Sequence, residues 1–577
     1  MKYLKYMYKF GVTDLKEYLG NDIVDTLIEW FPNSDNLLTR ERLITMIDSI
    51  HGMNILRNRK FRYDLLQSMS PKEIYTIRDY CLIGDERKDD NLTELVEIIS
   101  SKPWNRNIVT SYLIKIWELP ENIFDKEMDN TVTINHISSR ERFYELLDYQ
   151  YYIKQRVLNN LNSGNLQERM LIHMPTGTGK TKTSMHTITN YIEFSLEKKG
   201  LVIWIAHTIE LLQQAFDTFV EVWEHLGEGN INAYKIWGNH AIDDFTEPLS
   251  GIAFCGLAKL LSIHDSNSAL FDQLKRDCRL VVFDEAHKAA ASKTQRVIES
   301  LLKMPDGYDN RALIGLTATP GRTTNKSYDN NLLTNMFGGK LISIDASILN
   351  QINMGKLRAL NSLAEENIIK YFQERRILAK VRVDKLTYRT TFTEAEIKAL
   401  ESSLVDMGYS EKDFSEKQLK VFAVNKDRNR AIMEKLRELT IEKIPTIVFA
   451  CSVDHAKMLS AMLSLEGIPN SLVLGEKNSF ERRRAIDLFK DRNSNVDIII
   501  NYEVLTTGFD SKNIRCVFIA RPTQSIVLYS QMLGRGLRGP LMGGNEECLL
   551  VDIDDNLNAF DSEMAFSHFD DYWKPGR

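Results

Sequence analysis

Two short strings in the chain carry the residue types that bind and cleave a phosphate anhydride. The first, Met174–Thr181, reads MPTGTGKT. Gly177 and Gly179 allow the backbone to turn with its N–H groups facing inward, where they can cradle the β- and γ-phosphates of a nucleotide. Lys180 would add a positive charge on those phosphates, and the Thr181 hydroxyl can hold Mg²⁺. The residues that this pattern predicts to contact ATP are Pro175, Thr176, Gly177, Thr178, Gly179, Lys180 and Thr181.

The second string, Asp284–His287, reads DEAH and supplies two neighbouring carboxylates. We expect Asp284 to ligate the same Mg²⁺, and Glu285 to orient and deprotonate the attacking water. Each string follows an apolar run with the composition of a strand, Met170–Met174 in one case and Leu280–Phe283 in the other. Ligands of parallel α/β sheets lie at the carboxyl ends of strands, so both strings stand where a nucleotide site would form.

Length and composition indicate a large multidomain enzyme and argue against several other classes. The chain has 577 residues, 43% apolar and 26% charged, which is an ordinary globular composition with room for several cores. No apolar run reaches the ~18 residues of a membrane span, and the lysine-broken N-terminus lacks a signal-peptide core. Six cysteines without a C-x-x-C pair argue against a zinc ribbon and favour a reducing cytoplasm. With a net charge of −6, the chain would hold nucleic acid in a local groove.

Four stretches follow one another along the chain. Residues 1–139 show helical apolar stripes and are expected to form a helical accessory domain, either self-contained or packed on the first α/β domain. Residues 140–346 alternate strand and helix patterns, which is typical of a parallel sheet covered on both faces. Residues 347–442 are mostly helical and charged, and form either a linker with an insertion or the edge of the next domain. Residues 443–577 repeat the alternation without a phosphate loop, so this second domain is expected to complete the first domain's site across a cleft.

Short apolar runs predict the strands of both α/β domains. In the first domain the predicted strands are Met170–Met174, Val202–Ala206, Ile252–Cys255, Leu280–Phe283, Ala312–Leu316 and Leu341–Ile344. In the second domain they are Thr446–Ala450, Ser471–Leu474, Asp497–Asn501, Cys516–Ala520 and Cys548–Ile553.

One basic stretch stands out in the N-terminal region. Residues Arg57–Tyr63 read RNRKFRY, with basic side chains beside aromatic ones. A solvated helix face and a patch that contacts phosphates both fit this pattern. The sequence leaves the two readings open.

The second α/β domain carries a string that suits phosphoryl transfer. Gln531–Arg538 reads QMLGRGLR, with Arg535 and Arg538 three positions apart on one helix face. Planar guanidinium groups match the charge that develops on a transferring γ-phosphoryl group, so both arginines are predicted to be catalytic together with Lys180 and Glu285.

These strings, in this order, resemble the motifs of superfamily 2 helicases of the DEAH type over about residues 140–555. The resemblance implies an α/β fold of two tandem RecA-like parallel-sheet domains, preceded here by the helical accessory domain. Leu146–Gln150 resembles the motif that reads adenine through its glutamine, Gln150, although Leu147 replaces the family's usual arginine. Within the superfamily, Ile519–Asp552 is most similar to restriction-enzyme subunits and to bacterial repair helicases.

The same resemblance implies roles for residues outside the phosphate site. Contacts to nucleic-acid phosphates would come from His207, Thr208, Ser452, Thr506 and Thr507. ATP would also be contacted by Gly508 and Asp510. Coupling of hydrolysis to movement would involve His287, Thr317, Thr319 and Gln531.

The function predicted from these motifs is an ATP-dependent DNA helicase or translocase that uses ATP and Mg²⁺ in the cytoplasm. It would serve a bacterial defence or repair complex, with a protein partner such as a nuclease bound through the N-terminal domain. Two alternatives stay open: a nucleic-acid-gated ATPase switch that signals to a partner without processive unwinding, and an RNA helicase, since none of these motifs clearly reads the 2′-OH.

Overall fold

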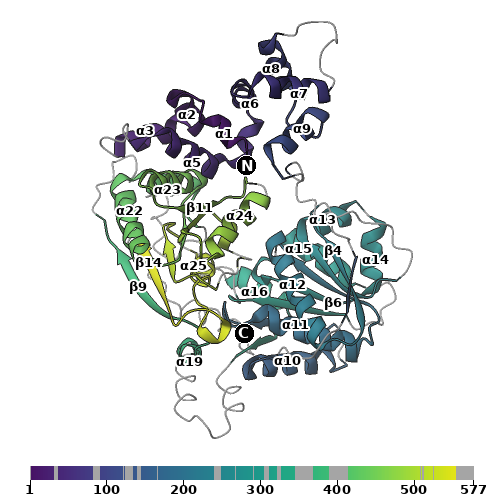
Figure 1. Ribbon diagram of the computed structural model, residues 1–577. Helices are drawn as coiled ribbons and strands as arrows, with labels where there is room; N and C mark the ends of the chain where they lie inside the picture. Colours follow the sequence, from purple (N-terminus) through teal and green to yellow (C-terminus); the bar gives the residue numbers. More distant parts are fainter. Residues whose placement is uncertain are drawn as a thin grey trace.

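The chain folds into an N-terminal helical region and two domains that are each built on a mostly parallel sheet (Figure 1). The computed structural model describes residues 2–30, 37–81, 91–120, 123, 134–138, 145–164, 167–238, 248–266, 268–289, 291–303, 311–320, 327–344, 368–388, 413–477, 479–506, 509, 512–523 and 525–553. The predicted α/β class, with two tandem parallel-sheet domains and an N-terminal helical region, is confirmed.

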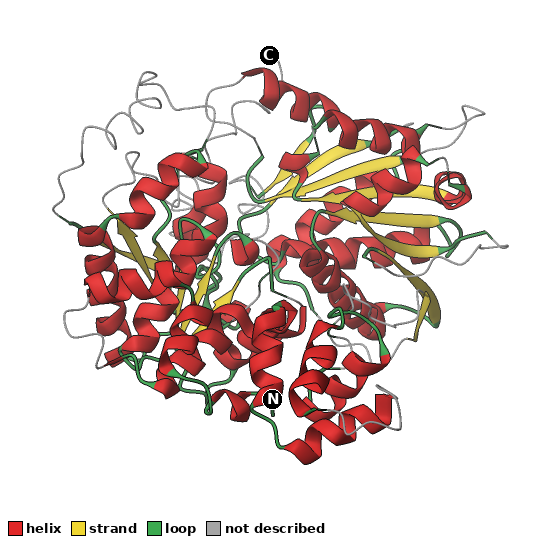
Figure 2. Ribbon diagram, turned by 90° about the horizontal axis from the view of Figure 1, so that it is seen from above, coloured by secondary structure: helices red, strands yellow, loops and turns green. Residues whose placement is uncertain are grey.

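The first domain contains an eight-stranded sheet in the order β1-β4-β5-β3-β6-β7-β2-β8. Its strands are β1 (Ile134–Ser138), β2 (Arg169–His173), β3 (Leu201–Ala206), β4 (Asn230–Ile236), β5 (Gly251–Gly256), β6 (Cys278–Asp284), β7 (Ala312–Thr317) and β8 (Leu341–Ser343). The helices α10 (Asp148–Leu161), α11 (Lys180–Asn190) and α12 (Ile209–Leu226) pack on one face, and α13 (Leu257–Asp265), α14 (Ala269–Asp277) and α15 (Ser292–Leu302) pack on the other. Figure 2 shows these helices on both sides of the strands. Strands such as β3 are buried along their whole length because both faces are covered.

Two strands of this sheet were not predicted. β4 carries polar residues between its apolar ones, and β1 is a five-residue strand that pairs with it in antiparallel orientation. Neither has the continuous apolar run of a central parallel strand, because both lie towards an edge of the sheet. The structure therefore places residues 134–138, which fall within the range 1–139 assigned to the accessory domain, in the sheet of the first α/β domain.

The second domain contains a six-stranded parallel sheet in the order β11-β12-β10-β13-β14-β9. Its strands are β9 (Lys380–Leu386), β10 (Thr446–Phe449), β11 (Asn470–Val473), β12 (Ile498–Asn501), β13 (Cys516–Ile519) and β14 (Glu547–Ile553). Helices α22 (Lys426–Ile441) and α23 (Val453–Leu465) cover one face, and α24 (Ser479–Lys490) and α25 (Ile526–Leu533) cover the other. β9 lies within 347–442 and pairs with β14 at the sheet edge, so of the two readings for that stretch the described part fits the edge of the second domain.

The helices of the N-terminal region contact the second domain through α3 and α5. They are α1 (Leu4–Met7), α2 (Val12–Leu19), α3 (Asn21–Trp30), α5 (Arg40–His51), the 3₁₀ turn η1 (Gly52–Arg57), α6 (Arg59–Gln67), α7 (Pro71–Cys81), α8 (Leu92–Ser101) and α9 (Ile108–Trp117). In Figure 1, α1, α2, α3 and α5 lie over α23, and α3 and α5 pack against it. Ser49 Oγ is 3.3 Å from Ser460 Oγ, and Asn54 Nδ2 donates to the Glu476 carbonyl at 3.1 Å. One apolar cluster continues from these helices into the second domain, whereas the sequence had left open a self-contained fold or packing on the first domain.

Basic side chains at the start of α6 bond to other groups of the helical region. Arg62 is buried, and its guanidinium donates to the carbonyls of Leu56 at 2.7 Å and Ser100 at 2.8 Å. Arg59 pairs with Glu97, and Lys60 pairs with Glu17. A phosphate would have to compete with these partners, so the structure favours the reading of this stretch as part of a helix surface.

Candidate active site

The phosphate loop joins the carboxyl end of β2 to the start of α11. Gly177 and Gly179 have φ values of +88° and +84°, a left-handed conformation that favours glycine. Gln150 Nε2 and the Tyr149 hydroxyl both donate to the Thr178 carbonyl, at 2.9 Å and 2.7 Å. A Cβ atom on Gly179 would lie 2.3 Å from Gln150 Nε2, so a larger residue there would displace the glutamine amide from its present position. Helix α10 thus supports the loop through these two hydrogen bonds. Gln150, which was predicted to read adenine, is bonded to the loop itself.

The two carboxylates of the DEAH string face Lys180 across the loop. β6 ends at Asp284, and Lys180 Nζ lies 3.6 Å from Asp284 Oδ1 and 3.6 Å from Glu285 Oε1. Glu285 has a φ of +55°, and its backbone N–H donates to Asp284 Oδ1 at 3.0 Å. On the far side of Glu285, His287 Nδ1 is 3.4 Å from Glu285 Oε2. The structure therefore brings together the three charged groups that the sequence assigned to phosphate, metal and water.

The charges of this cluster support one another. Burial would lower the pKa of Lys180, but the carboxylates of Glu285 and Asp284 outweigh it and raise that pKa above its ordinary value. Burial would raise the pKa of Glu285, but Lys180, His287 and Arg535 hold it at about 2. Burial dominates at Asp284 and raises its pKa. Glu285 is consequently ionised at neutral pH, as a group that accepts a proton must be.

The arginine string of the second domain lies on the phosphate loop. A Cβ atom on Gly534 would be 2.5 Å from Thr176 Cγ2, and a Cβ atom on Gly177 would be 3.6 Å from Arg538 Cγ. Arg535 donates to the Phe509 carbonyl at 2.8 Å and to the Gln531 carbonyl at 3.2 Å. Burial lowers the pKa of Arg535, and Glu285 opposes that effect, which places this guanidinium within electrostatic reach of the carboxylate.

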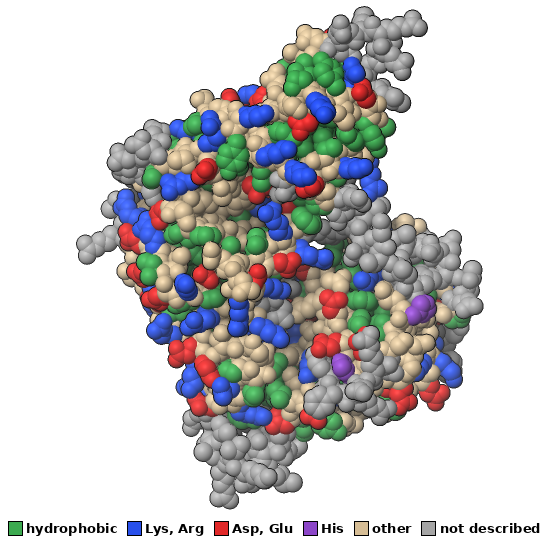
Figure 3. All heavy atoms as spheres, in the orientation of Figure 1, with side chains coloured by type: hydrophobic (Ala, Val, Ile, Leu, Met, Phe, Trp, Pro, Cys, Tyr) green, Lys and Arg blue, Asp and Glu red, His purple; other side chains and the backbone are tan. Residues whose placement is uncertain are grey.

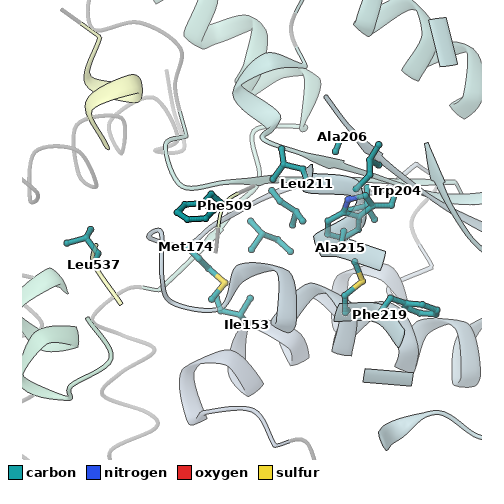
Figure 4. Close-up of a cluster of buried hydrophobic side chains, with 14 of the residues drawn as sticks. Ile153, Met174, Trp204, Ala206, Leu211, Ala215, Phe219, Phe509 and Leu537 are labelled. Carbon is teal, nitrogen blue, oxygen red and sulfur yellow. The ribbon is translucent and has the colours of Figure 1, made fainter. Parts of the chain in front are cut away.

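A continuous apolar cluster supports this contact between the domains. Met174 at the start of the loop and Ile153 of α10 belong to it, as do Phe509 and Leu537 of the second domain. Figure 4 shows Met174 beside Ile153, with Phe509 and Leu537 on the side of the second domain. Packing of this kind holds the arginine string against the loop in the arrangement described.

Two threonines of the predicted coupling string are tied to each other and to the loop strand. The Thr317 hydroxyl donates to the Thr319 carbonyl at 2.7 Å and accepts from the Thr319 N–H at 3.0 Å. His173, the last residue of β2, lies 3.1 Å through Nε2 from the Ala318 carbonyl. Sequence reasoning assigned His173 no role, although a histidine within an apolar strand just before a phosphate loop is a signal that could have pointed to one.

The residues predicted to contact nucleic acid differ in the hydrogen bonds that their side chains make. Thr208 and Ser452 are the N-caps of α12 and α23, where their hydroxyls accept from Leu211 N–H at 3.3 Å and His455 N–H at 3.1 Å. Thr506 instead donates its hydroxyl proton to the Glu503 carbonyl at 2.6 Å.

His207 lies beside the DEAH string. Its ring meets the Phe283 ring edge-on at 5.4 Å, and burial, with Lys288 and His287 nearby, lowers its pKa to about 4. The imidazole is therefore neutral at physiological pH. The predicted residues Thr507, Gly508 and Asp510 lie outside the described residues.

Leu378 and Arg375 of the third stretch and Met542 of the second domain, which sequence reasoning missed, also lie at or beside the loop. Leu378 Cδ2 would be 3.3 Å from a Cβ on Gly177, and Met542 Cε would be 3.2 Å from a Cβ on Gly179. Arg375 pairs with Asp148 at the start of α10, at 2.9 Å. No local pattern marks these residues, because each is brought to the loop by long-range packing.

Comparison with known proteins agrees with this geometry. Residues 143–322 match the family described as type III restriction enzyme, res subunit, and residues 428–539 match the helicase conserved C-terminal domain. The chain belongs to the superfamily 2 helicases. Its two matched regions carry the loop and DEAH string on one side of the site and the arginine string on the other.

Relatives of this helicase-family chain include restriction subunits as well as helicases. It is 27% identical over 418 residues to the putative mitochondrial ATP-dependent helicase irc3 of Schizosaccharomyces pombe, covering 72% of this chain and 58% of that protein. It is 24% identical over 408 residues to the type I restriction enzyme EcoAI endonuclease subunit of Escherichia coli, covering 67% and 44%. The chain thus spans about half the length of the curated relatives it matches.

A solved fragment of a putative HsdR subunit of a type I restriction enzyme from Vibrio vulnificus YJ016 covers 81% of this chain and 71% of that chain, with 17% identity and a TM-score of 0.44.

Within the described ranges, no helix of this helicase-family chain is both long and apolar enough to cross a membrane.

Proposed function

We propose that the chain is a DNA-stimulated ATPase that converts hydrolysis into movement along DNA. The observation that carries the proposal is the position of Lys180, 3.6 Å from both Asp284 and Glu285, beneath the arginine string of the opposite domain. This arrangement surrounds one point with cations, carboxylates and inward-turned loop backbone, which is what a transferring phosphoryl group requires.

The residues fit Mg²⁺ bound together with the phosphates of ATP. Thr181 and Asp284 would hold the ion with one hydroxyl and one carboxylate. Among the described residues no group of three His, Cys, Asp or Glu side chains forms a metal cage, which suits an ion that takes its other ligands from phosphate and water. The ion would neutralise charge on the β- and γ-phosphates.

Glu285 is proposed to accept a proton from water as the water oxygen attacks the γ-phosphorus. The bond from that phosphorus to the β–γ bridging oxygen then breaks, and ADP is the leaving group. Lys180, Arg535 and Arg538 meet the negative charge on the phosphoryl oxygens. Burial lowers the pKa of Arg538 only to about 10, so this guanidinium stays charged at neutral pH.

The nucleic-acid backbone would lie across helix N-termini of both domains. Thr208 and Ser452 accept hydrogen bonds through their oxygens as caps, so each hydroxyl keeps its own proton for donation to a phosphate. The Thr506 hydroxyl already donates a hydrogen bond to the Glu503 carbonyl, so it could donate to a phosphate only after that bond is broken. Basic and acidic side chains are intermingled on the face seen in Figure 3. DNA is favoured because the relatives include restriction enzyme subunits and the ATP-dependent DNA helicase fml1.

The test is ATPase activity with and without DNA or RNA over a series of salt concentrations. We expect DNA to stimulate hydrolysis, with a stimulation that falls steeply as salt rises because phosphate contacts release counterions. Stimulation by RNA alone would select the RNA helicase alternative. An ATPase that neither nucleic acid stimulates would contradict the proposal.

The N-terminal helices favour a second candidate, in which ATP-driven closure signals to a partner. α5 packs on α23, and Ser452 caps that same helix, so movement at this proposed phosphate contact would reach the N-terminal surface directly. A strand-displacement assay and a triplex-displacement assay separate the two candidates, since a switch would show stimulated hydrolysis without displacement. The proposed role in defence or repair, with a nuclease as partner, is tested by co-purification of the full chain with the products of adjacent genes.

A further inference from the structure

One short segment touches both halves of the candidate active site. It consists of α19 (Ile368–Glu374) and the turn that follows to Ala379. Towards the first domain, the Phe372 ring meets the Tyr149 ring edge-on at 5.1 Å, and Arg375 Nη1 donates to Asp148 Oδ1 at 2.9 Å. The segment therefore holds the start of α10, the helix that braces the phosphate loop.

Towards the second domain, the same segment is bonded to the arginine string. The Ala379 N–H donates to the Leu537 carbonyl at 2.9 Å, and the Gly539 N–H donates to the Ile377 carbonyl at 2.9 Å. Leu378 bridges to Arg538 in antiparallel fashion while its side chain lies against Gly177 of the loop. A displacement of the segment would thus shift the loop and the arginines relative to each other.

Asp148 is the point at which the segment acts on the loop. Its Oδ1 also accepts from the Tyr149 N–H at 2.8 Å, which fixes the first turn of α10. From that turn, Tyr149 and Gln150 both donate to the Thr178 carbonyl. A continuous chain of bonds hence leads from the guanidinium of Arg375 to the backbone of the phosphate loop.

The residue before Asp148 shows why an ion pair at this helix start matters. The N-cap residue of α10 is Leu147, whose apolar side chain offers neither a cap nor a guanidinium. Arg375 brings one to the same helix start from more than two hundred positions along the chain. Asp148 also lines a groove of about 640 Å³ together with Glu145, Tyr151 and Lys154, so the pair stands at the wall of that groove.

We propose that Arg375 is a positioning residue for the nucleotide, acting through Asp148 on the phosphate loop. The segment from α19 to Ala379 then keeps the loop and the arginine string in register. This inference rests on the proposed function in one respect only, namely that the ligand of the loop is ATP or ADP.

The test measures binding of a fluorescent ADP analogue to the full chain, without nucleic acid and without hydrolysis. Arg375→Ala and Asp148→Asn remove the ion pair from either side, and the asparagine keeps an oxygen for the Tyr149 N–H. The matched control is Arg376→Ala, which removes the neighbouring arginine and its exposed pair with Glu546. We expect the first two variants to weaken binding about tenfold, a coupling of typical size for one charged contact. The double variant should be no weaker than either single one, and Arg375→Lys should recover part of the loss.

Several outcomes would overturn the inference. Binding by Arg375→Ala within twofold of Arg376→Ala would do so, as would additive losses in the double variant. A lowered melting temperature for Arg375→Ala with unchanged nucleotide binding would show a purely structural role. If nucleotide binds normally but nucleic acid fails to stimulate hydrolysis, the proposed function fails while this inference stays testable by the same binding measurement.

Discussion

The carboxyl ends of the two parallel sheets are built in opposite ways. At the first sheet, Lys180 Nζ lies 3.6 Å from Asp284 Oδ1 and 3.6 Å from Glu285 Oε1, and the charges of these side chains are available to a ligand. At the second sheet, two buried polar side chains, Arg428 and His455, are bonded inside the domain. Arg428 donates to the Ala520 carbonyl at 2.7 Å, and His455 lies 2.8 Å from Asn429 Oδ1.

This difference suggests a division of labour between the domains. Burying charged groups costs free energy unless the charges pair with one another or with a ligand. The first domain is therefore suited to bind a ligand and to carry out the reaction. Buried polar groups that are bonded within a domain make it rigid, so the second domain is suited to hold Arg535 and Arg538 in fixed positions. The following predictions test that contrast, from the largest expected effect to the smallest.

Glu285→Gln should abolish turnover while ATP still binds. The neutral amide cannot accept the proton of the attacking water, whereas Lys180 and Asp284 keep their charges. We expect ATPase activity to fall by about 10²–10⁴-fold, the usual contribution of a general base. Hydrolysis and nucleotide binding are measured side by side on the same preparation. Near wild-type turnover would mean that another group takes the proton.

Arg535→Ala and Arg538→Ala should lower kcat by about 10²-fold each, with a much smaller loss of ATP affinity, because they meet charge that develops during transfer. Arg382→Ala, on the exposed edge strand β9, is the matched control and should leave both values unchanged. Steady-state kinetics together with equilibrium binding of ATP give the two values separately. Weak binding combined with normal turnover at saturating ATP would assign the arginines to the ground state instead.

Removal of residues 1–130 should destabilise the second domain more than the first. The deletion exposes the face of α23 and the buried side chains of Lys477 and Glu481. We expect a lowered melting temperature, with basal ATPase activity per folded molecule largely intact because no residue of the site lies in the deleted part. Calorimetry and limited proteolysis show which domain opens. A truncated chain with unchanged melting temperature would mean that the helical region is merely tethered.

The interface between the helical region and the second domain should gain stability as pH rises above about 8. Burial lowers the pKa of Lys477 from 10.5 to about 8. Between these values the unfolded chain still binds the proton and the folded chain does not, so the free energy of unfolding increases with pH. We expect a gain on the order of 2 kcal/mol, measured by denaturant unfolding at several pH values. Lys477→Met should remove this part of the pH dependence. An equally steep rise in that variant would trace it to other groups.

Local patterns in the sequence determined much of the fold and of the phosphate site. Apolar runs predicted β2, β3, β5, β6 and β7 to within two residues at each end, because a strand buried on both faces leaves a continuous signal. The short edge strand β8 was predicted equally closely. Glycine spacing in the loop and the strand that ends at Asp284 predicted that Lys180 and the two carboxylates lie near one another, as the structure has them. Their catalytic and metal-binding roles stay predictions.

Only the tertiary structure decided how the parts meet. The helical stripe around Val24 and Leu27 predicted α3, but the choice of the second domain as its neighbour depends on the shape of α23, which no local pattern records. The same holds for Arg375, whose partner Asp148 is distant in sequence. Periodicity reports which face of an element is apolar, whereas the partner of that face is set by complementarity between surfaces that exist only once both have folded.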